Sequence, residues 1–99
     1  MKATPEEKQA SAAALATAIL GVPNALRGHR NELLSICVWK WTEAHGKYRG
    51  CRYWTRAALE AGDIRLLAHE HVVPRRQLVM ALVEEGVPVP DLLTRMGIA

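Results

Sequence analysis

Helix start and stop signals divide this chain into short segments, and they limit its possible folds more than any other feature. Thr4 can cap a helix, and Glu7 stands three residues after it, which is the capping-box pattern. Gly21 and Pro23 follow the apolar run and are typical of a helix end. These signals predict a first helix over Pro5 to Leu20.

The apolar face of this first helix is mostly alanine, with only Leu15 and Ile19 as large residues. Small side chains let a neighbouring helix approach closely, but they bury little apolar area. A second helix is expected to begin between Asn24 and Asn31, either of which can cap it. It should run to about His45, because a glycine follows there.

The apolar residues of the second helix recur with helical spacing and predict one buried stripe. The members of this stripe are Leu33, Leu34, Cys37, Val38 and Trp41. Ile36, Trp39 and Lys40 fall on other faces. Trp39 is therefore the ring that a single core explains least, and an exposed Trp39 would mark a contact surface.

The middle of the chain gives weaker structural signals. A turn over Gly46 to Gly50 and a short helix over Tyr53 to Ala61 are expected there. The next stretch allows either a short helix over Ile64 to His69 or one extended segment near Glu70 to Val73. The extended alternative arises because Pro74 favours extended geometry in the residue before it.

Pro74 is expected to start a firm helix that ends at Glu85, with a buried stripe of Leu78, Val79, Leu82 and Val83. An extended linker and a short helix over Asp91 to Met96 follow. This layout is that of a helix-turn-helix. Two prolines lengthen its turn, however. Its second helix offers only Thr94 and Arg95 as polar residues that could contact DNA bases, so ordinary helical packing is favoured.

Together these elements predict a mainly α protein, a compact bundle of about four to five short helices that forms one domain over residues 1–99. A domain of this size is marginally stable by itself, so pairing with a second copy is an open possibility.

No apolar run is long enough to cross a membrane, and Glu6 and Glu7 stand where a secretion signal carries positive charge, so a cytoplasmic location is expected. For the two cysteines, Cys37 and Cys51, free thiols are favoured over a single bridge.

Basic and aromatic residues are concentrated in one central segment. From Lys40 to Arg56 there are five basic residues and one acid, although the whole chain carries a net charge of only +3. All five aromatic residues of the chain lie between Trp39 and Trp54. Rings can stack on nucleic acid bases while arginines hold phosphates, and the same residue types are enriched at protein-binding hot spots.

The predicted binding surface consists of these residues: Trp39, Lys47, Tyr48, Arg49, Arg52, Tyr53, Trp54 and Arg56. The competing interpretation is that the rings fill the core of a protein without phenylalanine and that the charges are ordinary surface. That interpretation is favoured for Trp41.

A second candidate site is His69-Glu70-His71. On an extended segment, His69 and His71 point the same way and can share one metal ion. A structural role for the histidines is favoured, because no further ligand stands at a diagnostic spacing.

Residues Glu70 to Pro74 also resemble the first motif of the HNH nucleases, in which an acid and a histidine precede two aliphatic residues and a proline. The resemblance implies His71 as general base and Glu70 as a ligand of a divalent metal. It covers this one motif, and no asparagine or histidine follows His71 to complete the family's pattern.

The sequence thus predicts a non-enzymatic binding module that presents a basic and aromatic surface to an acidic partner, either nucleic acid or an acidic protein surface. The alternative is a small metal-dependent hydrolase, similar to a nuclease, centred on His69, Glu70 and His71. No phosphate-cradling glycine motif occurs, so no cofactor is expected.

Overall fold

Residues 2–45, 60 and 73–97 are described by a computed structural model, and these residues form a helical bundle. Its helices are α1 (Pro5–Leu20), α2 (Arg27–Thr42), α4 (Arg75–Glu84) and α5 (Val89–Met96). The predicted mainly α class is confirmed, and no strand occurs among the described residues. The helix expected over Tyr53 to Ala61 and the extended segment expected near Glu70 to Val73 fall outside them, apart from the isolated residues Glu60 and Val73.

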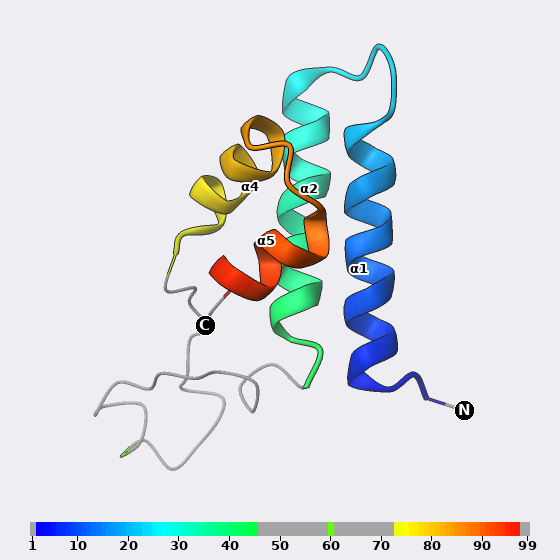
Figure 1. Ribbon diagram of the computed structural model, residues 1–99, viewed down its shortest axis with the longest axis vertical. Helices are drawn as coiled ribbons and strands as arrows, with labels where there is room; N and C mark the ends of the chain where they lie inside the picture. Colours follow the sequence, from blue (N-terminus) through cyan, green and yellow to red (C-terminus); the bar gives the residue numbers. More distant parts are fainter. Residues whose placement is uncertain (1, 46–59, 61–72, 98–99) are drawn as a thin grey trace.

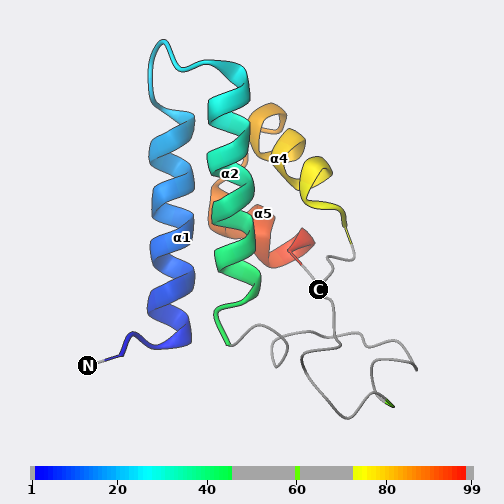
Figure 2. The same ribbon diagram turned by 180° about the vertical axis from the view of Figure 1, so that it is seen from behind.

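Each of the four described helices packs against two others of this set, so the bundle closes on itself. The helices α1 and α2 form an antiparallel hairpin, α4 packs against α2, and α5 lies across α1 and α4 (Figure 1). Seen from behind, α1 and α2 lie in front of α5 (Figure 2). Among the helices that the structure describes, those that pack on the hairpin lie on one side of it.

The first helix has the bounds that its signals predict. Thr4 Oγ1 accepts a hydrogen bond from the Glu7 backbone N–H at 3.1 Å, which satisfies one of the free amides of the first turn. The alanine face is buried, and Ala16 is completely inaccessible to solvent. Ala13 and Ala16 join one core cluster with Leu34 and Val38, so small residues on α1 do allow α2 to approach closely.

The second helix begins at Arg27, within the expected range, but its capping residue and its end differ from their predictions. Leu26 is its N-cap residue and provides no side-chain hydrogen bond, whereas Asn31 lies inside the helix. Asn24 adopts a left-handed conformation with φ 63°, which asparagine tolerates better than most residues, so it shapes the loop rather than the cap. At the other end the helix stops at Thr42, because Glu43 leaves helical geometry at φ −98° and ψ 15°.

Two leucines that were expected inside are on the surface. Leu33 is 49% exposed and Leu15 is 57% exposed, while Leu34, Cys37 and Val38 are buried. Adjacent residues on a helix point about 100° apart, and Leu33 lies beyond the side of α2 on which Leu34, Cys37 and Val38 pack into the core. The core of α2 follows Leu34, and Leu33 is left on the outside.

The last two helices follow their signals closely. Pro74 is the N-cap residue of α4, and Leu78, Val79 and Leu82 are buried, with Val83 partly buried. Gly86, at φ 63°, makes the turn after α4 possible in a conformation that L side chains rarely adopt. The helix α5 begins at Val89 rather than Asp91, because Pro90 is compatible with a first helical turn.

A larger residue in the alanine face should separate the hairpin. We expect Ala16→Leu to lower the free energy of unfolding by about 1–3 kcal/mol, because the new side chain has no space between α1 and α2. Ala14→Leu is the matched control, since Ala14 is exposed on the same helix and should change stability little. Urea denaturation followed by circular dichroism measures both, and equal stabilities would contradict the close packing described here.

Candidate basic interface

Trp39 and Arg75 form the contact that joins α2 to the start of α4. The guanidinium carbon of Arg75 lies 4.6 Å from the centre of the Trp39 ring, which is the geometry of a cation–π interaction. Trp39 is partly buried and Arg75 is exposed. The ring that a single core explained least therefore has a basic partner at the surface.

An open groove of about 510 Å³ runs between α2 and α4. We name it the arginine groove, and it is lined by Arg27, Asn31, Glu32 and Ser35 of α2 and by Arg75, Arg76, Val79 and Met80 of α4. Three of these residues are cations and one is an anion, so the groove is basic. The Trp39 ring adjoins it through Arg75.

The three arginines of the groove are exposed, and none of them forms an ion pair within the part of the chain that the structure describes. They also lie at helix N-termini, where a positive charge lowers the stability of the helix. Arg27 lies in the first turn of α2 and Arg75 and Arg76 in the first turn of α4, and neither turn contains an acidic residue. The N-terminus of a helix carries partial positive charge, so these cations raise a local positive potential that an anionic ligand would relieve.

Of the predicted binding residues, the structure describes only Trp39. The other seven lie outside the described residues: Lys47, Tyr48, Arg49, Arg52, Tyr53, Trp54 and Arg56. The segment that contains them begins after α2 and ends before α4, the two helices that form the groove. They remain predictions, and so does the binding surface as a whole.

Sequence reasoning missed Arg27, Arg75 and Arg76. A signal for them was present, because each stands in the first turn of a helix where acidic residues are normally preferred. Apolar periodicity could not predict that these residues line one groove, because it describes each helix separately.

The candidate metal site lies outside the described residues as well, since His69, Glu70 and His71 are not among them. Within residues 2–45, 60 and 73–97, no cluster of three side chains suited to a metal occurs. The hydrolase alternative therefore stays a prediction from sequence.

Ordinary packing accounts for the polar residues of α5. Thr94 Oγ1 donates a hydrogen bond to the Pro90 carbonyl oxygen at 2.8 Å, and Arg95 pairs with Glu85 at 2.8 Å. Thr94 and Arg95 were considered as DNA contacts of a helix-turn-helix, and both thus bind other residues of the α4–α5 hairpin.

Two further expectations concern α2. Trp41 is partly buried and packs against the core, as expected. Cys37 is a free thiol in the core, and burial raises its pKa. Nothing in this position favours the reactive thiolate.

No known protein family, no curated protein and no solved structure matches this chain significantly. Among the described helices, none combines the length and the apolar character that a membrane crossing requires.

The position of the arginines at helix starts predicts an effect on stability. We expect Arg76→Glu to raise the free energy of unfolding by about 0.3–1 kcal/mol, because it replaces a cation by an anion at the positive end of α4. Arg95→Glu makes the same change of charge near a helix C-terminus, where a positive charge stabilises the helix. Arg95 lies in the last turn of α5 and pairs with Glu85, so this variant should be less stable than the unmodified chain. Thermal melts at low salt compare the two, and a loss of stability in Arg76→Glu would refute the electrostatic argument.

The buried thiol predicts a dependence on pH. The pKa of Cys37 is higher in the folded chain than in the unfolded chain, so the folded state binds its proton more tightly. The resulting stability is fully present below the unfolded pKa and is lost as the pH rises through the folded pKa.

In a Cys51→Ser variant, labelling of Cys37 by a thiol reagent should be slow until denaturant is added, and fast labelling of the folded chain would contradict its burial.

Proposed function

We propose that this chain is a non-enzymatic helical binding module that holds an acidic partner, nucleic acid or an acidic protein surface, against a basic and aromatic surface. The observation that carries the proposal is the arginine groove, where Arg27, Arg75 and Arg76 are exposed and form no ion pair with any other described residue, and where Arg75 contacts the Trp39 ring. Exposed guanidinium groups along a groove suit anions, because each can form paired hydrogen bonds with a phosphate or a carboxylate.

Nucleic acid is the partner to test first. A single strand offers a repeated phosphate charge that matches several arginines at once, and its bases can stack on rings. The sequence places four more basic residues and three more rings between Lys47 and Arg56, in the segment that connects α2 to α4. These residues support the same function by their composition.

Binding is measured by titrating single-stranded oligonucleotides while following tryptophan fluorescence at two salt concentrations. We expect saturable binding that weakens as salt rises, because binding releases counterions from the phosphates. Arg76→Glu should weaken binding roughly tenfold and reduce the salt dependence, since one arginine contact is replaced by repulsion. This variant should be at least as stable as the unmodified chain, so a loss of binding cannot be ascribed to unfolding.

Lys2→Glu is the matched control, because it makes the same change in net charge outside the groove. It should bind nearly as well as the unmodified chain. If no salt-sensitive signal appears with oligonucleotides, the same titration with poly-glutamate tests the acidic protein alternative. If neither polymer binds, or if both variants weaken binding equally, the proposed function is wrong.

A further inference from the structure

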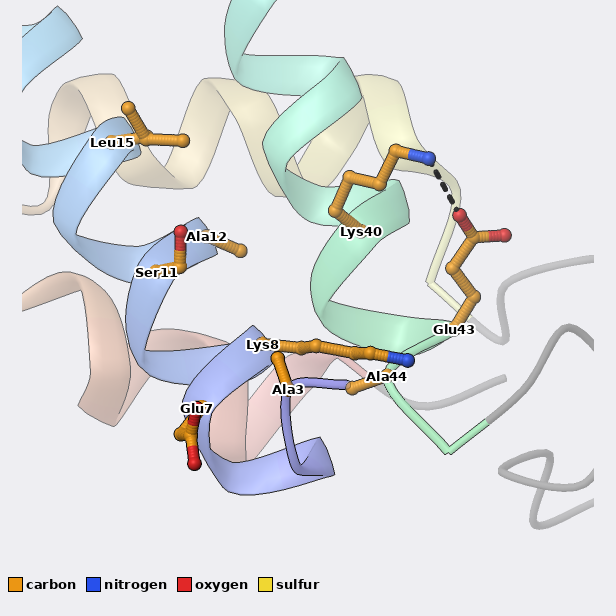
Figure 3. Close-up of a pocket in the computed structure, with 9 residues that line it drawn as sticks. All are labelled: Ala3, Glu7, Lys8, Ser11, Ala12, Leu15, Lys40, Glu43 and Ala44. Atoms are coloured by element: carbon orange, nitrogen blue, oxygen red, sulfur yellow. Dashed lines mark hydrogen bonds and ion pairs between the residues drawn. The ribbon is translucent and has the colours of Figure 1, made fainter. Parts of the chain in front are cut away.

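The hairpin of α1 and α2 has an outer face that no described helix covers, on the side nearest the viewer in Figure 2. We define this outer face by Leu15 of α1 and by Leu33, Ile36 and Lys40 of α2. The three apolar side chains are all about half exposed or more. Leu15 and Lys40 line one furrow between the two helices (Figure 3), and Ile36 lies one turn before Lys40 on α2.

Exposed apolar residues are not spread evenly over the described part of the protein. Six large apolar side chains are exposed there, and five of them belong to α1, α2 or the loop between these helices. On a small protein, a concentration of this kind marks an interaction surface. The charges beside it indicate which partner would fit.

Charges of opposite sign stand at equal distances on either side of Ile36 along α2. Lys40 lies one turn after Ile36 and Glu32 one turn before it. If a second α2 crosses the first in antiparallel orientation at Ile36, Lys40 meets Glu32. A parallel crossing would instead bring each charge against its own copy.

We propose that two copies of this chain associate through the outer face as a twofold dimer, with their α2 helices antiparallel and in contact at Ile36. Such an interface is isologous, so every contact occurs twice. Leu15 and Leu33 extend the apolar contact on the same face. At each end of this contact, Lys40 of one copy forms an ion pair with Glu32 of the other. This inference goes beyond the proposed function and does not depend on it.

The ion pair within each chain is compatible with this arrangement. Lys40 Nζ donates to Glu43 Oε1 at 3.0 Å, as drawn in Figure 3, and the Lys40 side chain remains 64% exposed. An ammonium group has three donors, so Glu32 of the second copy can be a further acceptor. Glu32 is also the one acidic residue that lines the arginine groove. Its pairing in the dimer would leave the groove more basic and would strengthen the binding of an anion.

Sedimentation equilibrium of the full chain over a wide range of concentration tests the dimer. The average mass should rise from 11.0 kDa toward twice that value as the concentration increases. Ile36→Asp should remain a monomer, since it places a charge at the centre of the apolar contact. Ala14→Asp, on the exposed opposite edge of α1, should behave like the unmodified chain. A mass that stays at 11.0 kDa throughout, or an Ile36→Asp variant that still associates, overturns the proposal.

A charge exchange tests the antiparallel register. Lys40→Glu should weaken association roughly tenfold, because two carboxylates then meet at each edge. Adding Glu32→Lys should restore it, since the exchanged pair is again of opposite sign between copies. The added change does not rebuild the Lys40–Glu43 pair within the chain, so recovery cannot come from that pair. Circular dichroism confirms that each variant is folded, and a double variant that associates no better than Lys40→Glu rules out this register.

Discussion

The close contact between the alanine face of α1 and the apolar stripe of α2 is the interaction on which the rest of the structure depends. Ala13 and Ala16 bring the helix backbones near each other, so Leu34 and Val38 can reach one shared core with α4 and α5. α5 contacts both α1 and α4 and completes this core. Dispersion and apolar burial favour this arrangement, but small residues supply little area. Among the described residues, the buried leucines and valines of the core all lie on α2, α4 and α5.

The arginine groove exists because α4 starts beside the middle of α2. Arg75 contacts the Trp39 ring there, with its guanidinium carbon 4.6 Å from the ring centre, and it places positive charge at a helix N-terminus, where the helix itself is already positive. Electrostatic repulsion of this kind lowers stability and is relieved when an anion binds. The same local charge distribution thus connects the stability of α4 with the proposed affinity for an acidic partner. Acidic residues at these positions would make the helices more stable, so a surface with a purely structural role would favour them.

Two surfaces of different character share the helix α2. One edge faces α4 and is basic, while the outer face opposite the core is apolar with charges of both signs at its margins. Glu32 stands at the border and contributes to both. Because the described helices cover α2 on only part of its circumference, it can present two surfaces at once, and a change at Glu32 would alter both of them.

In the part of the chain that the structure describes, the sequence by itself determined the four helices, most of their buried residues and the mainly α class, because caps, prolines, glycines and apolar spacing are local signals. It gave the bounds of α1 correctly and identified Trp39 as a ring outside the core stripe. Only the tertiary structure decided that Leu15 and Leu33 are exposed, since exposure depends on where the neighbouring helices lie and not on spacing within one helix. The meeting of Arg27 with Arg75 and Arg76 was decided in the same way: these residues are distant in the chain, and the packing of α4 against α2 brings them to one groove.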